Sequence, residues 1–310
     1  MQWYNYSSMT AYTQVSSNQF KTWLIMFFFS LFVVGVIYIL ARGFGFDGPS
    51  SVGFVGFALI FTGIINFFTY FYSDKMVMAI SRAKQIQKKD NPTLFRTIEN
   101  LSIASGLPMP KVYIIEDSAP NAFATGRNPK HSSIAFTSGI LEKLSKLELE
   151  GVAAHELSHV GNRDTLLMAV VSVLVGTVAL LSDWYFRSML WGGRDSNDDN
   201  RSNAIFMILA IVMAILAPLI GTLIQFAISR KREYLADASG ALLTRNPDSL
   251  ADALIKISND PEPLEVANRA TEPLYIVNPF KGKQLTAAFA NLFNTHPPIE
   301  ERVKALRAMQ

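Results

Sequence analysis

The chain has 310 residues, of which half are hydrophobic and only 17% are charged. This balance excludes an intrinsically disordered protein and is more typical of a membrane protein than of a soluble one. The net charge of +3 is too small to indicate nucleic-acid binding, so no nucleic-acid partner is expected. Because the chain has no cysteine, disulfides and thiolate metal sites are excluded, and a metal would have to be held by histidine and carboxylate or carbonyl oxygen.

Four stretches without Asp, Glu, Lys or Arg divide the chain, namely residues 22–41, 51–73, 165–182 and 202–229. Each is about long enough to cross the bilayer core, which takes roughly 17 to 25 helical residues. A buried core helix is the alternative, and it applies best to the third and shortest stretch. The sequence therefore predicts a polar segment over residues 1–21, a transmembrane hairpin over residues 22–73, and a domain over residues 74–310 that a second hairpin interrupts.

Basic residues beside these stretches predict the orientation. The loop between the first two stretches carries one basic residue, Arg42, whereas five follow the second stretch: Lys75, Arg82, Lys84, Lys88 and Lys89. Since short cytoplasmic segments are enriched in Lys and Arg, residue 75 onward and both termini are expected in the cytoplasm. Residues 230–232, all basic, follow the fourth stretch and agree with this. The loop over residues 183–201, which mixes three arginines with aspartates, is expected outside.

The polar residues 74–164 and 230–310 are predicted to form one domain. Cap and turn signals, with Asn91-Pro92 before it and Gly106 after it, favour a helix followed by two strands over residues 111–116 and 132–136. Further helices are expected to begin at Ser145, at Arg230, near Pro247 and at Pro298. Residues 260–282, rich in Pro and Asn, are expected to form a loop.

The sharpest motif is His155-Glu156-Leu157-Ser158-His159. Histidines at i and i+4 lie one turn apart on the same helix face, so both can bind one zinc ion. The glutamate beside the first histidine is then placed to act as general base towards water at the metal. Ser145 and Glu148 form a possible capping box at the start of this helix, and Gly161 is placed to end it.

A catalytic zinc needs a third protein ligand, and neither remaining histidine is suggested by its spacing. Glu233 and Asp237 share a helix face just beyond the fourth apolar stretch. Glu233 can be the third ligand, and Asp237 can accept a hydrogen bond from the far nitrogen of a ligand histidine. A solvated charge cluster at the membrane exit is the alternative. At about 1.5 Å per helical residue, the metal would lie within roughly 10 Å of the cytoplasmic bilayer surface.

With these motifs the sequence resembles the HtpX family of membrane zinc metalloproteases, which is related to the CAAX prenyl endoproteases. The resemblance covers residues 24–306 and rests on four elements in the expected order: Asn121 to Gly126, His155 to His159, Glu233 to Asp237, and Thr295 to Pro298 followed by Arg302. It implies a cytoplasmic gluzincin (thermolysin-like) domain in a bacterial plasma membrane. It also implies protein substrates, namely misfolded, damaged or misassembled membrane proteins.

The resemblance further suggests roles for weaker signals. Asn121 and Ala122 would bind an extended substrate by strand addition, whereas the residues alone favour an ordinary Asn/Gly turn. Either His296 or Arg302 would stabilise the oxyanion. The alternative makes His296 a helix-cap or core residue and Arg302 a surface charge. His131, which has no partner signal, is treated as structural.

These observations predict a mostly α membrane protein with a small β-sheet and four transmembrane helices, acting as a zinc endopeptidase. One Zn²⁺ per chain would be held by His155, His159 and Glu233, with Glu156 as general base. An intramembrane protease is disfavoured because polar and charged residues surround the motif. A non-catalytic zinc-binding membrane scaffold or zinc carrier is a further alternative. A carrier should place ionisable ligands inside its spans, and the four apolar stretches contain neither charge nor histidine.

Overall fold

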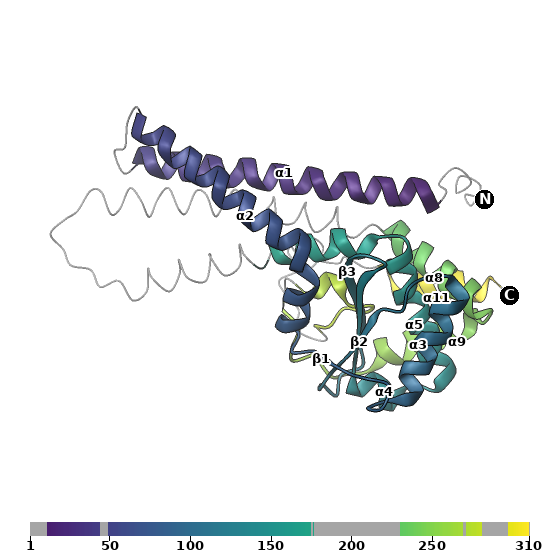
Figure 1. Ribbon diagram of the computed structural model, residues 1–310. Coiled ribbons are helices and arrows are strands. Elements are labelled where there is room, and N and C mark those ends of the chain that lie inside the picture. The colour runs from purple at the N-terminus through teal and green to yellow at the C-terminus, as the bar shows by residue number, and fades with distance from the viewer. Residues whose placement is uncertain are drawn as a thin grey trace.

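The computed structural model describes residues 11–43, 49–174, 176, 230–268, 271–280 and 297–309. Within them, two long helices project from a body built of a four-stranded sheet and shorter helices (Figure 1). The expectation of a mostly helical protein with a small sheet is therefore confirmed. The fourth predicted span, the end of the third and His296 lie outside the described residues.

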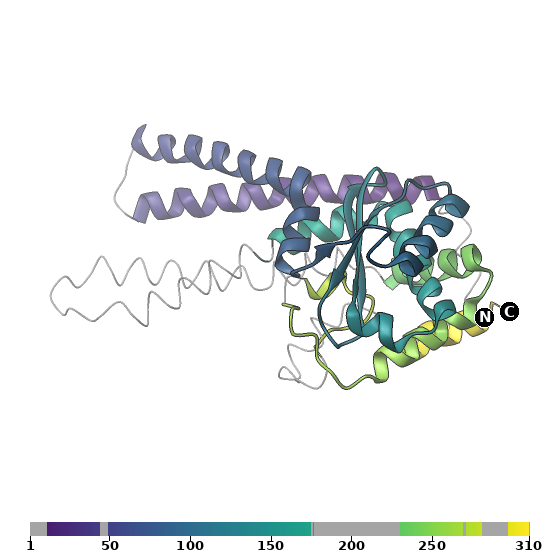
Figure 2. The ribbon, with the colours of Figure 1, turned by 60° about the horizontal axis from the view of Figure 1, so that its bottom comes forward.

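The two long helices are α1 (Ala11–Gly43) and α2 (Pro49–Ile80), and they run side by side in both views (Figures 1 and 2). Between them, the amide of Asn66 on α2 donates a 2.7 Å hydrogen bond to the hydroxyl of Ser30 on α1. Most of their large apolar side chains are exposed rather than packed in a protein core. A long exposed apolar surface of this kind suits a lipid environment.

Two stretches of these helices, Ser16–Gly35 and Gly53–Ile80, are long and apolar enough to cross a membrane by length and composition. They correspond to the first two predicted spans. Helix α1 already begins at Ala11, so its polar first turns continue into the span, and Asn18 there is buried and donates to the carbonyl of Asn162. The described part of the third predicted span is a shorter apolar helix, Asp164–Leu174, whose side chains are buried.

The sheet has the order β1-β2-β4-β3. Its strands are β1 (Lys84–Gln85), β2 (Lys111–Ile115), β3 (Ala122–Asn128) and β4 (His131–Thr137). β2 and β4 are parallel and the other pairs are antiparallel, and both predicted strands are confirmed. The Asn/Gly turn expected at residues 121–126 is wrong, because this segment is an edge strand. Its small residues give a weak strand signal, but seven residues of β4 offer it a buried partner.

The helices of the body are α3 (Pro92–Ser105), α4 (Ser138–Lys143), α5 (Lys146–Gly161), α8 (Arg230–Thr244), α9 (Pro247–Asn259), the short 3-10 helix η1 (Glu272–Leu274) and α11 (Ile299–Arg307). The predicted caps at Asn91, Gly106 and Ser145 are confirmed, whereas α5 includes Gly161 and its C-cap is Asn162. Asn91 accepts from the Leu94 amide and Gly106 ends α3 in the left-handed conformation, while Ser145 and Glu148 form the capping box of α5. The expected helix starts near Pro247 and Pro298 are confirmed too, and residues 230–244 are helical as expected.

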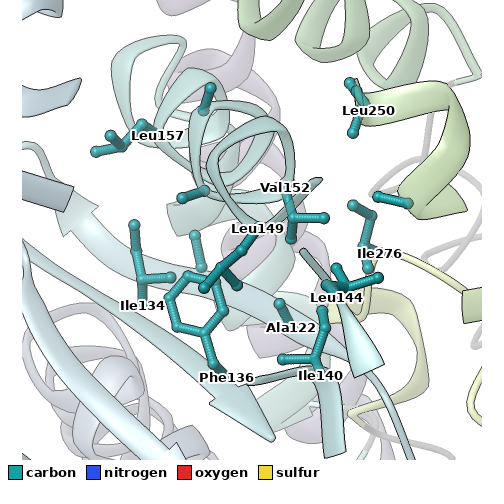
Figure 3. Close-up of a cluster of buried hydrophobic side chains, with 14 of the residues drawn as sticks. Ala122, Ile134, Phe136, Ile140, Leu144, Leu149, Val152, Leu157, Leu250 and Ile276 are labelled. Carbon is teal, nitrogen blue, oxygen red and sulfur yellow. The ribbon is translucent and has the colours of Figure 1, made fainter. Parts of the chain in front are cut away.

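Helix α5 lies between the sheet and the other helices (Figure 3). Its apolar side chains belong to one hydrophobic core, to which the sheet, α9 and the segment after η1 also contribute. The core residues labelled in Figure 3 include Leu149, Val152, Ile134, Phe136, Leu250 and Ile276. A helix buried on all sides has little hydrophobic asymmetry, which is why its polar members stand out. His155, Glu156 and His159 are the polar residues of its last two turns that are buried.

Gly126 gives a test of the edge strand. Its φ is +138°, and an added Cβ would lie 2.3 Å from the His131 carbonyl oxygen. We expect Gly126→Ala to lower the free energy of unfolding by about 2–4 kcal/mol, because backbone strain and a clash combine. Gly106→Ala is the control, since its φ is +68° but its surroundings are open, so it should cost about 1 kcal/mol. Thermal unfolding followed by circular dichroism measures both, and equal shifts would contradict this account of β3.

Candidate metal centre

Two helices supply the candidate ligands. α5 presents His155 and His159 one turn apart, and α8 presents Glu233. The helices approach closely at Gly240, where an added Cβ would lie 3.0 Å from the backbone nitrogen of His155. A side chain at residue 240 would therefore push α8 away from α5. The glycine therefore lets α8 approach α5 closely enough for the three candidate ligands to converge.

The three side chains converge as predicted. The Nε2 atoms of His155 and His159 are 3.1 Å apart, and oxygens of Glu233 lie 3.8 Å and 3.5 Å from them. All three residues are buried. Ligand atoms at about 2.0–2.2 Å from a tetrahedral zinc are roughly 3.3–3.5 Å from one another. The donor set and its spacing thus fit zinc.

The outer nitrogens of the imidazoles explain this geometry. Nδ1 of His155 lies 2.9 Å from an Asp237 oxygen, and Nδ1 of His159 lies 3.2 Å from an Asp164 oxygen. We assign the proton to Nδ1 in both rings from these carboxylate partners. Both Nε2 lone pairs then point at the same place. Two lone pairs 3.1 Å apart repel each other unless a proton or a metal ion lies between them, so a metal bound here would take the place of a shared proton.

The buried ionisable groups shift one another's pKa values. Burial alone would lower the pKa of His159, but Asp164 and Glu233 raise it to about 9. For His155, burial outweighs the contact with Asp237 and the pKa is lowered. Burial is also the main reason that the pKa of Glu156 rises to about 7. The site therefore holds ionisable groups in unusual protonation equilibria, as expected of a functional centre.

Arg302 is fully buried, so the alternative of a surface charge is wrong. Its Nε and one terminal nitrogen donate to the two oxygens of Asp237 at 2.8 Å and 2.7 Å. Burial works against this pair, yet Arg302 still holds the pKa of Asp237 below its ordinary value. The other terminal nitrogen donates to the Ile276 carbonyl at 3.0 Å. Arg302 thus links the partner of His155 to a segment that lies along β3.

The candidate substrate residues Asn121 and Ala122 are buried beside this segment. The Ile276 amide donates to the Ala122 carbonyl at 3.0 Å, and the Asn121 side chain donates to the Val277 carbonyl at 2.9 Å. Two residues further along β3, the Ala124 amide donates to the Glu156 carboxylate. The outer edge of β3 therefore passes directly by the candidate general base.

Asp164 is a site residue that the sequence analysis did not single out. It contacts His159, accepts from the Asn18 amide of α1, and lies 3.7 Å from Arg232. Its position just after the end of α5 could have indicated this role, because a turn there can bring the Asp164 carboxylate back to His159. His131 lies apart from the centre, exposed at the start of β4 with its Nδ1 3.0 Å from the Asn128 side chain.

Asp164→Asn tests the role of this carboxylate. An amide cannot favour the Nδ1 proton of His159 as strongly as a carboxylate does, so we expect zinc affinity to fall roughly 10- to 100-fold. Competition with a chelating dye measures the affinity. Asp90→Asn removes a carboxylate that only caps the Gln87 amide and should leave affinity unchanged. Equal affinities for the two variants would exclude this role for Asp164.

The model of peptidase family M48 matches residues 88–310. A protein named Protease HtpX homolog from Dictyoglomus thermophilum is 43% identical over 97% of this chain and 95% of its own length. Another of that name, from Lactobacillus helveticus, is 44% identical over 96% and 99%.

Among solved structures, the crystal structure of S. mikatae Ste24p matches with a TM-score of 0.51 at 18% identity and covers 92% of this chain. This chain spans 66% of the length of that protein. At this level of identity the likeness concerns the fold alone.

Proposed function

The chain belongs to peptidase family M48 and to its HtpX proteases, and on this premise we propose that it is a membrane-anchored zinc endopeptidase. The membership confirms the resemblance drawn from the motifs. The observation that carries the proposal is the convergence of His155, His159 and Glu233 on one point, with Glu156 buried beside them. The proposed arrangement is that of a gluzincin, with two histidines from one helix and a glutamate from another.

Each residue of the centre has a task in peptide hydrolysis. His155, His159 and Glu233 would hold the zinc, which when bound supplies a Lewis acid for the scissile carbonyl. Glu156 takes the proton of the attacking water and returns it to the leaving amine. Its carboxylate is held by the Ala124 amide, which fixes it next to the strand along which we place the substrate. Asp164 and Asp237 orient the two imidazoles.

We place an extended substrate on the outer edge of β3. The outward polar groups of this edge are those a peptide would use for strand addition. Ile276 and Val277 support the assignment because they are hydrogen-bonded there as a peptide would be. The Ile276 amide donates to the Ala122 carbonyl, and the side-chain amide of Asn121 donates to the Val277 carbonyl. Arg302 donates to the Ile276 carbonyl. A substrate would take their place, so that Arg302 donates to a substrate carbonyl. His296 keeps its predicted oxyanion role.

The proposed setting is the cytoplasmic face of a bacterial plasma membrane, with misfolded or damaged membrane proteins as substrates. Two apolar helices that could span a membrane, the basic residues after α2, and the names of the HtpX relatives support this setting. A site that binds extended chains suits unfolded segments, because a folded protein has few unpaired strands to offer. Residues 165–182 and 202–229 are proposed as the second hairpin.

Glu156→Gln decides between an enzyme and a zinc-binding scaffold. We expect casein cleavage to fall roughly 10²- to 10⁴-fold, since the amide cannot move a proton, while zinc content stays at one ion per chain. The protein is purified with chelator and then given zinc. Glu150→Gln changes the same side chain on the same helix, outside the buried centre, and should leave turnover unchanged. Loss of zinc in Glu156→Gln, or cleavage at the wild-type rate, would refute the assignment.

Displacement of Ile276 is tested by hydrogen exchange on the zinc-loaded Glu156→Gln protein, which should bind an unfolded peptide without cleaving it. The Ile276 amide is hydrogen-bonded to Ala122 in the free protein. We expect its exchange to become faster when the peptide binds, because the peptide takes that acceptor. Amides in the middle of α9 serve as the internal control. Peptide binding with unchanged exchange at Ile276 would place the substrate elsewhere while leaving the proposed hydrolysis intact.

A further inference from the structure

A second pocket lies away from the metal centre, where α2 meets the sheet. It measures about 500 Å³ and is formed by the end of α2, the start of β2 and the β3–β4 turn. Its lining combines aromatic and basic side chains, among them Phe67, Phe71, Lys75, Lys111, Arg127 and Lys130. The last charge-free residue of the second apolar stretch is Ser73. The pocket therefore lies where the chain leaves its apolar span.

Positive charge dominates this pocket. Four cations, Lys75, Lys111, Arg127 and Lys130, face one carboxylate, that of Asp74. In the part of the chain that the structure describes, none of the four cations has a carboxylate oxygen within 4.0 Å. Four cations gathered around a single carboxylate repel one another, so an anion bound among them would be favoured.

Aromatic residues of α2 position two of these cations. The guanidinium of Arg127 lies over the Phe71 ring, 4.9 Å from its centroid, and donates to the Phe71 carbonyl at 3.3 Å. The ammonium of Lys75 lies 5.1 Å from the centroid of the Tyr72 ring. Such contacts restrain long side chains before a ligand arrives. They also leave nitrogen donors available for an anion.

The wall towards the membrane is apolar. Phe67 lines the pocket and is 54% exposed, and Ile64 and Ile60, one and two turns earlier on α2, are 51% and 67% exposed. These residues belong to the stretch Gly53–Ile80 that could span a membrane. A ligand here would have an anionic end among the cations and an apolar end along α2. Free phosphate or a nucleotide would use only the first of these surfaces.

We propose that this pocket binds the phosphate headgroup of an anionic phospholipid, whose acyl chains lie along Phe67 and Phe71. The inference rests on the proposed membrane setting and does not depend on catalysis. Basic pockets beside transmembrane helices on the cytoplasmic side are suited to anionic headgroups. Because the pocket joins α2 to the turn that leads out of β3, a bound lipid would hold the substrate strand against the membrane helix.

The test measures lipid retention by native mass spectrometry of the zinc-free wild-type chain in detergent, with phosphatidylglycerol and phosphatidylcholine as probes. We expect phosphatidylglycerol to bind at least roughly tenfold tighter, and the double variant Lys111→Ala, Lys130→Ala to lose about tenfold of that affinity. Both lysines are exposed, so the fold should persist. The double variant Lys89→Ala, Lys146→Ala removes the same charge from exposed residues outside the pocket and should bind as the wild type does.

Three results would overturn the proposal. Equal affinity for the two lipids would show that the pocket does not distinguish an anionic headgroup from a zwitterionic one. Equal loss in both double variants would indicate a general surface potential rather than a site. Displacement of phosphatidylglycerol by millimolar inorganic phosphate or glycerol phosphate would indicate a free-phosphate site, if these anions also protect the chain from thermal unfolding as well as the lipid does. Because no cleavage is measured, a failure of the proposed protease activity would leave these results unaffected.

Discussion

The close contact between α5 and α8 is the constraint on which the candidate site depends. Gly240 lets the backbone of α8 reach the backbone of His155, and this brings Glu233 to the Nε2 atoms of both histidines. The same contact places Asp237 behind the first imidazole and Arg302 behind Asp237. Buried charges are unfavourable unless they are paired. Here each carboxylate has a cation or an imidazole beside it, so the cluster is stable only when the two helices are in register.

The membrane helices join the same network through Asp164. This carboxylate lies between His159 of α5, Asn18 of α1 and Arg232 of α8. A residue of the first long helix thus contacts the partner of a candidate metal ligand. Since Asn18 is buried against the body, α1 cannot move away without exposing Asp164, whose other oxygen contacts His159. Helix α1 and the candidate site therefore belong to one network of contacts. This explains why the polar first turns of α1 do not form a separate tail.

Much of this arrangement follows from local sequence signals. The caps at Asn91 and Ser145 and the pair of histidines one turn apart were predictable because each depends on residues within one or two turns. β3 was not, since its small residues become a strand only through pairing with β4. The contacts of Arg302 and Asp164 were also hidden, because they join residues that are distant in sequence. The pairing of Glu233 with the histidines was predictable because Glu233 shares a helix face with Asp237, because the family resemblance includes this segment, and because neither remaining histidine has a suitable spacing.

The proposed substrate site at the outer edge of β3 would have to meet two opposing needs. An enzyme that binds extended peptides by strand addition must keep unpaired main-chain groups beside its general base, yet an open strand edge also pairs with unwanted chains. Ile276 and Val277 cover this edge with the hydrogen bonds a peptide would make, and their buried side chains complete the core. A segment held by three such bonds can be displaced only by a chain that makes as many. Displacement would therefore select long unfolded segments over short or folded ones, so selectivity for unfolded proteins would arise at the strand edge before any side chain is recognised.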